Sequence, residues 1–317
     1  ALVAAAEAGK SVLAVIELEA RDNEESNVQL AKRLEAAGVQ IVYGIVGLKI
    51  HCKVAVIVRR EGDESVTYTH FGTGNYHPQN ARTYTDLSLF TKDPQLGDDA
   101  HRVLSYLTSG HLTAVEKLVV APFHLRRTLY ELIEREIEHA RAGRRAHICI
   151  KVNSLTDIAM IDHLYAASEA GVEIDLIIRR QCCLRPAMEG LSSRIRVRSI
   201  IGRFLEHSRI FLFANGEGFA SEQADVFIGS ADLMERNLDD RVELLVPIQD
   251  PTARRQVVDG IMHANLKDTR QTWLLDSDGH YVRHAERDGF CAQSFFMSTP
   301  DPTELGRLDD LLAERID

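Results

Sequence analysis

The chain has 317 residues, 45% of them hydrophobic and 26% charged, and its formal net charge is −10 at pH 7. The length allows two domains with separate cores, and the acidic balance argues against a general nucleic-acid binder. No apolar run approaches the roughly 20 residues that a membrane span needs. The five cysteines have neither disulfide nor zinc spacing, which favours a reduced, cytoplasmic setting.

The first half alternates predicted strands and helices. The chain begins with Ala1–Ala6, which is typical of the middle of a helix, so we expect an N-terminal part to precede it. Hydrophobic periodicity predicts helices at 25–37 and 96–107, and strands at 11–18, 39–43, 51–59, 66–71 and 83–89. We expect the boundary near 112–122, which gives a first domain of residues 1–118 and a second of residues 119–317.

The second half repeats this order of elements. Helices are expected at 125–142, 157–170 and 253–266, and strands at 147–152, 172–178, 195–201, 208–213, 224–228 and 241–246. The tail from Asp276 onward is polar, with a predicted terminal helix at 303–316, and we assign no chemistry to it. The matching order predicts the α/β fold class, built from a duplicated unit.

One motif occurs in both halves. The first copy has His51 and Lys53 at the mouth of a strand, followed by a Gly-containing turn that ends in Asn75. The second copy has His207 and Arg209, followed by a turn that ends in Asp232. Because residues i and i+2 of a strand point to the same face, each histidine shares a face with its cation. Two such halves facing each other would place both imidazoles in one cleft suited to a phosphorus centre.

Arginines are concentrated between residues 176 and 209. The eight arginines there stand against only two acids, Glu189 and Glu206. A basic island in an acidic protein suggests a focused anion site. The alternative is a strand whose outward face carries arginines.

The duplicated His-x-cation units with a downstream Gly-x-Asn resemble the phospholipase D superfamily, in which one histidine attacks phosphorus and the other donates a proton. This implies two tandem phospholipase D-like α/β domains related by pseudo-two-fold duplication. The superfamily motif also has an aspartate in each copy, and Val58 and Ala214 stand at those positions here. The departure argues against phosphodiester hydrolysis.

Seven ordered segments resemble the C-terminal half of the polyphosphate kinase family more closely. They are residues 19–22, 48–53, 70–76, 81–86, 164–168, 177–179 and 204–207. The resemblance implies reversible transfer of the ATP γ-phosphate to inorganic polyphosphate. It also implies two upstream domains that complete the adenine pocket, so this part of the enzyme alone is expected to be incomplete. Homo-oligomers and association with the inner membrane surface are further implications.

The resemblance also assigns roles. His51 matches the histidine that becomes a phosphohistidine, and His207 matches the second required histidine, which contacts ATP and which we expect to serve the leaving oxygen. Tyr84 and Arg179 match groups at the nucleotide. Arg21 matches an arginine at the magnesium site; because a guanidinium has no acceptor lone pair, we expect it to act through phosphate oxygens.

The repeat alone gives positioning and charge-neutralising roles to Lys53, Asn75 and Arg209. Weaker candidates for lining a polyphosphate channel are Arg82, Arg180 and Arg198. Mg²⁺ is expected to arrive with ATP, because no carboxylate cluster has the pattern of a metal cage. Two other functions stay open: a phospholipase D-type phosphodiesterase or transferase, and a catalytically silent polyanion-binding module.

Overall fold

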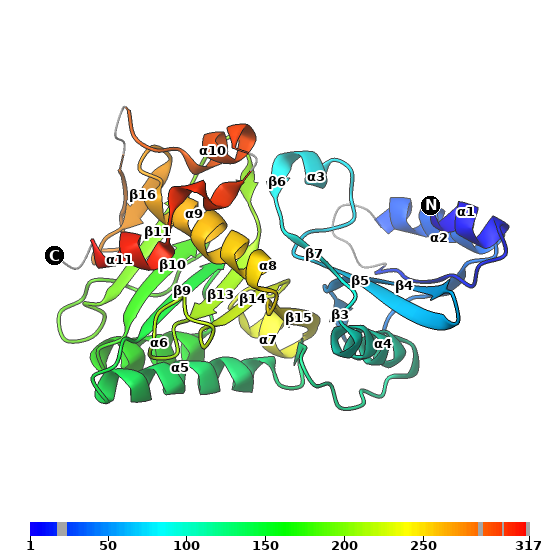
Figure 1. Ribbon diagram of the computed structural model, residues 1–317, viewed down its shortest axis with the longest axis horizontal. Helices are drawn as coiled ribbons and strands as arrows, with labels where there is room; N and C mark the ends of the chain where they lie inside the picture. Colours follow the sequence, from blue (N-terminus) through cyan, green and yellow to red (C-terminus); the bar gives the residue numbers. More distant parts are fainter. Residues whose placement is uncertain (18–23, 285–287, 300, 315–317) are drawn as a thin grey trace.

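The computed structural model describes residues 1–17, 24–284, 288–299 and 301–314. It is an α/β protein with mixed sheets, and Figure 1 shows a large sheet in the C-terminal half beside a smaller N-terminal half. None of the helices in these ranges is long and apolar enough to cross a membrane.

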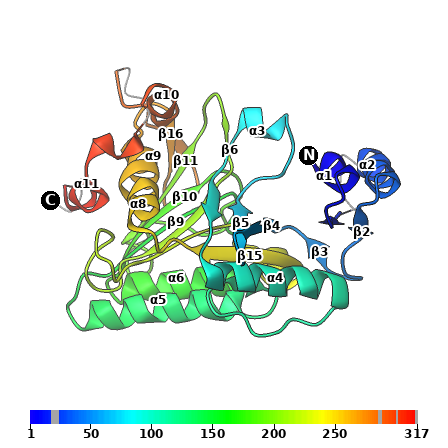
Figure 2. The same cartoon turned by 45° about the vertical axis from the view of Figure 1, so that its right-hand side comes forward.

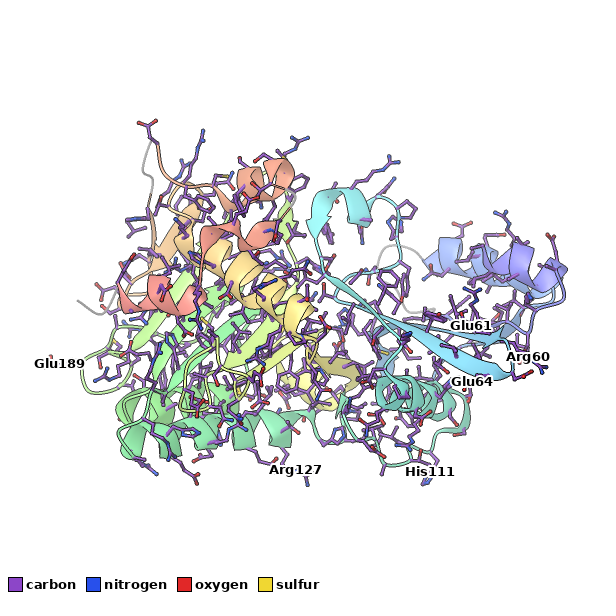
Figure 3. The ribbon with its side chains drawn as sticks, viewed as in Figure 1. Arg60, Glu61, Glu64, His111, Arg127 and Glu189 are labelled. Atoms are coloured by element: carbon purple, nitrogen blue, oxygen red, sulfur yellow. The ribbon has the colours of Figure 1, made fainter. Side chains whose placement is uncertain are left out.

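The N-terminal half holds two small sheets. Strands β1 (Leu13–Val15) and β2 (Gln40–Val42) pair in parallel, with helices α1 (Leu2–Glu7) and α2 (Glu24–Ala36) beside them. Strands β4 (Lys53–Glu61), β5 (Glu64–Gly72) and β7 (Ser88–Thr91) form an antiparallel sheet. Figure 3 shows Arg60, Glu61 and Glu64 at the tip of the β4–β5 hairpin, where their charges face solvent.

Helix α4 (Pro94–Ser109) carries the chain out of this half. Asp93 caps its first turn by accepting a hydrogen bond from the backbone of Leu96, and Pro94 takes the first helical position, where no N–H is needed. Gly110 ends the helix in the left-handed conformation. The buried side of α4 packs on β4 and β5.

The C-terminal half is organised around a ten-stranded mixed sheet. Its order is β17-β16-β11-β10-β9-β13-β14-β15-β3, with β8 paired to β15. These strands are β8 (Val119–Ala121), β9 (His147–Val152), β10 (Glu173–Ile178), β11 (Ile195–Ile200), β13 (Arg209–Phe213), β14 (Asp225–Gly229), β15 (Arg241–Pro247), β16 (Thr272–Leu275), β17 (Tyr281–Arg283) and β3 (Lys49–Ile50).

Helices cover both faces of this sheet. Helices α5 (Leu125–Arg141) and α6 (Ile158–Glu169) lie along one face, and a continuous helical stretch of α8 (Pro251–Arg255), η1 (Gln256–Met262) and α9 (His263–Lys267) lies on the other (Figure 2). The remaining elements are α7 (Glu235–Asp239), α10 (Ala292–Ser298), η2 (Pro302–Leu305) and α11 (Leu308–Ala313). Continuous apolar runs such as residues 210–213 are buried because both faces are covered.

Each half lends a short strand to the other. Strand β3, which precedes His51, pairs in parallel with β15 of the second half. Strand β12 (Leu205–Glu206), which precedes His207, pairs in parallel with β6 (Tyr84–Thr85) of the first half. The two histidines therefore enter the space between the halves from opposite sides.

Several expected elements have different bounds. The strand expected at 83–89 is two strands, because Tyr84–Thr85 pair with β12 whereas Ser88–Thr91 pair with β5. The terminal helix expected at 303–316 is interrupted at Gly306, whose φ of 90° ends η2 before α11 begins. Strands β8, β16 and β17 and helices α3 (Asn80–Thr83), α7 and α10 were not expected from the sequence.

Candidate active site between the halves

His51 is held by a carboxylate from the opposite half. Its backbone N–H donates to the Val242 carbonyl at 3.0 Å, and its Nδ1 lies 2.8 Å from Oε2 of Glu243. Glu243 is fully buried and also accepts hydrogen bonds from Ser230 and from Asn237. The carboxylate thus fixes the imidazole with Nδ1–H as the donor. Within the described part of the chain, no hydrogen bond to Nε2 of His51 is seen.

This setting keeps the His51 imidazole neutral. Burial lowers the pKa of His51 to about 4, with Lys53 and Arg209 lowering it further and Glu243 opposing them. A neutral imidazole with Nδ1–H bound to a carboxylate has its lone pair on Nε2, which makes Nε2 a nucleophile near neutral pH.

His207 has the mirror arrangement. Its Nδ1 lies 2.8 Å from Oδ1 of Asp86, a residue of the first half, and Thr73 donates to the same oxygen at 2.7 Å. Nη1 of Arg209 lies 3.1 Å from Nε2 and 3.3 Å from Nδ1 of His207, so this imidazole has a cation against its ring. Burial lowers the pKa of His207, and the Arg209 charge acts in the same direction, against Asp86.

The carboxylates Asp86 and Glu243 were missed in the sequence. Each stands 13 residues after a hydroxyl residue of the Gly-containing turn, Thr73 or Ser230, that donates to it. The equal spacing was visible in both copies. The function of the carboxylates could not be predicted from this spacing, because each carboxylate binds the histidine of the other half.

Gly74 makes room for Asp86. A Cβ built on Gly74 would lie 2.0 Å from Oδ2 of Asp86, so any other residue here would force the Asp86 carboxylate to move. The glycine in this turn therefore allows the backbone to approach the carboxylate that orients His207.

The two motif cations occupy equivalent places. Lys53 donates to the carbonyl of His51, and Arg209 donates to the carbonyl of His207 at 2.8 Å. Arg209 also pairs with Asp232 through two nitrogens at 3.2 Å each. Both cations are buried, and burial lowers the pKa of Lys53 to about 8.

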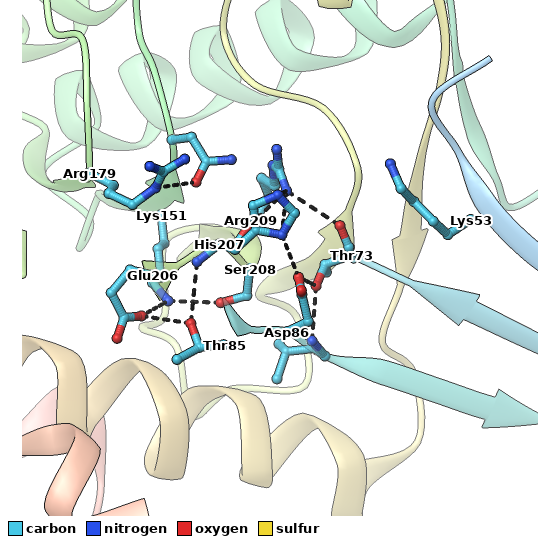
Figure 4. A network of polar contacts seen from close by, with 12 residues as sticks. Lys53, Thr73, Thr85, Asp86, Lys151, Arg179, Glu206, His207, Ser208 and Arg209 are labelled. Carbon is cyan, nitrogen blue, oxygen red and sulfur yellow. Dashed lines mark hydrogen bonds and ion pairs between the residues drawn. The ribbon is translucent and has the colours of Figure 1, made fainter. Parts of the chain in front are cut away.

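The charges link the two half-sites. Arg209 lowers the pKa of His51, and Lys53 lowers the pKa of His207, so each cation acts on the histidine of the opposite half. Figure 4 shows Arg209 against His207, with Lys53 on one side of this pair and Arg179 on the other. Such a group of fixed donors suits a phosphate with several oxygens.

The other expected site residues lie at different distances from this centre. The ring of Tyr84 lies 4.9 Å from that of His207, and half-buried Arg179 donates to Asn153 at 3.0 Å. Burial lowers the pKa of Arg179, and Asp232 opposes the shift while Arg209 adds to it. Asn75 is exposed and lines a cavity of about 680 Å³ together with Asp86. Arg21 lies outside the described residues.

The basic island does not converge on one site. Arg196 pairs with Asp175 and Glu173, Arg194 pairs with Glu173, and buried Arg198 donates to the Leu266 carbonyl. The placement of Arg198 in a channel was therefore wrong, because its guanidinium is satisfied inside the fold. Among the described residues of the island, Arg209 contacts His207, and Arg179 lies near enough to Arg209 and Asp232 to sense their charges. Arg180 of the island and Arg82 outside it are exposed.

Carboxylates near the histidines are already engaged. Asp86, Asp232 and Glu243 each bind an imidazole or a guanidinium, which makes them poor ligands for a resident cation. Elsewhere among the described residues, His147, Cys149 and Asp175 lie close enough to hold a metal ion, but Asp175 is taken by Arg196 and His147. The carboxylates near the histidines are therefore poorly placed to hold a resident cation.

Comparison with known proteins agrees with this geometry. Residues 1–113 match the family described as "Polyphosphate kinase C-terminal domain 1", and residues 118–293 match "Polyphosphate kinase C-terminal domain 2". The chain is 53% identical over 303 residues to a polyphosphate kinase of Erythrobacter litoralis, covering 95% of this chain and 42% of the relative. It is 48% identical over 291 residues to that of Streptomyces coelicolor, covering 91% of this chain and 38% of the relative.

A solved structure has the same fold. The crystal structure of polyphosphate kinase from Porphyromonas gingivalis superposes with a TM-score of 0.82 at 36% identity, covering 99% of this chain and 46% of that one. The chain thus spans less than half the length of these relatives. It belongs to the polyphosphate kinase family, of which it carries C-terminal domains 1 and 2.

Proposed function

We propose that this chain carries out the phosphoryl-transfer step of an ATP–polyphosphate phosphotransferase, through a phosphohistidine at His51. The observation that carries the proposal is the pairing of two neutral, carboxylate-held imidazoles with two buried cations that act on both of them. Phosphoryl transfer needs mainly alignment and neutralisation of oxygen charge, which these groups supply.

The first step begins at Nε2 of His51. Its lone pair attacks the γ-phosphorus of ATP, the bond between γ-phosphorus and the bridging oxygen breaks, and ADP leaves with the electron pair. Glu243 stabilises the positive charge that forms on the imidazole, because it accepts the Nδ1–H bond. In the second step a terminal phosphate oxygen of polyphosphate attacks phospho-His51 and releases Nε2, and the reverse sequence makes the transfer reversible.

His207 transfers protons to and from the phosphate oxygens that leave and attack the phosphorus. His207 is neutral at rest, and its Nε2 accepts the proton of an entering phosphate; the imidazolium that results donates the same proton to the phosphate oxygen that leaves in the reverse transfer. Arg209 beside that nitrogen, together with Lys53, neutralises oxygen charge. Tyr84 and Arg179 are proposed to bind the nucleotide and Asn75 to position it, with Mg²⁺ held chiefly by the phosphates of ATP.

The division of the chain is also a proposal. We propose two phospholipase D-like domains, residues 1–118 and 119–317, related by pseudo-two-fold duplication. The reciprocal pairing of β3 with β15 and β12 with β6 supports it, as do the matched family ranges. A homo-oligomer, a cytoplasmic setting and association with the inner membrane surface stay predictions; light scattering and fractionation measure them.

The experiment that tests the function is phosphoenzyme labelling. The full-length protein is incubated with γ-³²P-labelled ATP, and acid-labile, base-stable label is expected on His51. His51→Ala should abolish the label, whereas His163→Ala, which removes a histidine stacked on Tyr130 at the protein surface, should keep it. Absence of label in the wild type together with release of an alcohol or nucleotide from a phosphodiester would favour the phospholipase D-type reaction instead. Polyphosphate binding without label would favour a silent module.

A further inference from the structure

A buried lysine lies on the strand next to His207. Lys151 on β9 is 2% exposed, and its Nζ donates to Oε2 of Glu206 at 2.6 Å and to Oγ of Ser208 at 2.7 Å. Glu206 and Ser208 flank His207 in the chain. Figure 4 shows this cluster beside the imidazole. The proposed chemistry gives it no role.

Glu206 connects three parts of the fold. Besides Lys151, its carboxylate accepts from Thr85 Oγ1 at 3.0 Å and from Gln293 Nε2 of α10 at 2.7 Å. Gln293 also bonds both backbone groups of Phe204. The tail, to which the sequence pattern assigns no chemistry, therefore supports the strand that precedes His207.

Thr85 links this cluster to the histidine. Its hydroxyl oxygen accepts the backbone N–H of His207 at 3.2 Å while its hydroxyl hydrogen is donated to Glu206. A continuous series of hydrogen bonds thus runs from Lys151 through Glu206 and Thr85 to the His207 backbone. Lys151 and Glu206 keep Thr85 in the orientation that makes it an acceptor for His207.

The site needs such support because its strands are short. Strands β12 and β6 pair over only two residues each, which is too short a ladder to fix register by backbone bonds alone. His207 follows β12, whereas Asp86 follows β6. A small slip between the strands would separate the imidazole from its carboxylate.

Among the described residues, no buried ion pair of this kind is seen beside His51. Ile50 precedes His51 where Glu206 precedes His207, and β3 is joined to the edge of the ten-stranded sheet. Buried ion pairs are often replaceable by apolar residues at little cost in stability, so retention of one beside His207 calls for another reason.

We propose that Lys151 and Glu206 are positioning residues that hold His207 against Asp86 through Thr85. The inference rests on the proposed function, since it concerns the histidine that serves the leaving and entering oxygens. It predicts that loss of the pair harms the transfer step more than it harms ATP binding.

The variants separate positioning from stability. Lys151→Met and Glu206→Gln should each lower kcat by roughly 10- to 100-fold, as expected for a misplaced catalytic group, with KM for ATP within about threefold. Lys151→Met leaves an unpaired buried carboxylate and should also lower the melting temperature. The double variant Lys151→Met/Glu206→Leu removes both charges and should regain the melting temperature but not kcat. Recovery of wild-type kcat in a stable double variant would overturn the proposal.

Two further variants act as controls. Thr85→Val removes the hydroxyl that joins Glu206 to the His207 backbone but keeps the ion pair, and it should lower kcat as the ion-pair variants do. Thr85→Ser keeps a hydroxyl and should have a kcat near that of the wild type. Arg196→Met removes a different ion pair, with the buried carboxylate of Asp175, and should leave kcat unchanged. Equal activity of Thr85→Val and the wild type would overturn the role of Thr85 and with it the proposal.

An NMR titration gives a readout that does not depend on activity. The histidine rings are labelled with ¹³C. The His207 signal is identified as the one that is lost in His207→Gln, and its chemical shift is then followed as the pH changes. We expect its pKa and shift to change in Glu206→Gln and in the double variant, and the His51 signal to stay. An unchanged His207 signal in every variant would refute the positioning role. Failure of the wild type to transfer phosphate would instead refute the proposed function and leave this measurement valid.

Discussion

The half-site around His51 and the half-site around His207 are built alike. Each imidazole gives Nδ1 to a carboxylate of the other half, each carboxylate is held by a hydroxyl of the Gly-containing turn, and each motif cation binds the carbonyl of its own histidine. They differ at Nε2. Arg209 lies against Nε2 of His207, while Lys53 turns to the backbone behind His51. The comparison teaches that a duplicated framework can leave the Nε2 of one histidine open as a nucleophile and place a cation beside the other histidine, where it can neutralise the charge of phosphate oxygens.

The largest expected effect comes from replacing either histidine singly with asparagine. His51→Asn should abolish phosphoenzyme formation and lower transfer by roughly 10⁴-fold or more, because the nucleophile is lost. His207→Asn should slow labelling by roughly 10²- to 10⁴-fold but leave label on His51, because only proton handling is lost. Rapid-quench labelling measures both. Equal labelling of the two variants would show that the two histidines do not have different roles as nucleophile and proton carrier.

The next effect comes from the carboxylates. Glu243→Gln should lower the labelling rate by roughly 100-fold or more, because an amide no longer stabilises the charge and tautomer of His51. Asp86→Asn should have a smaller effect, because the Asp86 side chain is 22% exposed whereas that of Glu243 is 0% exposed. Single-turnover kinetics with the full-length protein measures the order. A larger loss for Asp86→Asn would mean that His207 is the nucleophile.

A smaller effect is expected at the nucleotide. Arg179→Ala should raise KM for ATP by about 10- to 100-fold, because a charge-assisted hydrogen bond contributes roughly 1.5–3 kcal/mol. Arg194→Ala, from the same basic island, should leave KM unchanged, because Arg194 pairs with Glu173 at the surface. Identical behaviour of the two variants would put Arg179 outside the site.

The smallest effect concerns pH. The pKa of His51 lies near 4, so its neutral form persists down to about that pH and labelling should not fall between pH 8 and 5 on its account. The pKa of Lys53 lies near 8, so its charge is present below that pH and is lost above it. The rate should therefore fall severalfold above about pH 8. In Lys53→Arg this alkaline decline should disappear, and its persistence would assign it to another group.

Local patterns made part of this site predictable. The His-x-cation units and the Gly-containing turns are contiguous in sequence, so alternation on a strand was enough to place His51 with Lys53 and His207 with Arg209. Most strands around them were expected for the same reason. The α/β order and the family followed from such short segments.

The rest depended on contacts between distant segments. Asp86 and Glu243 act across the two halves, and their pairing with the histidines follows only from β6 meeting β12 and β3 meeting β15. Gln293 reaches Glu206 from a tail that has no pattern of its own. The basic island, to which Arg194, Arg196 and Arg198 belong, suggested an anion site because the acidic partners of these arginines on β10 are remote in sequence.

The central claim is that both imidazoles serve one phosphoryl group, and a crystal structure of the full-length protein with a non-hydrolysable ATP analogue tests it most directly. The account predicts the γ-phosphorus in line with Nε2 of His51 at about 3–3.5 Å, with Nε2 of His207 within hydrogen-bond reach of an oxygen on the same phosphorus. A γ-phosphate bound away from His51, or approached by only one of the two rings, would contradict it.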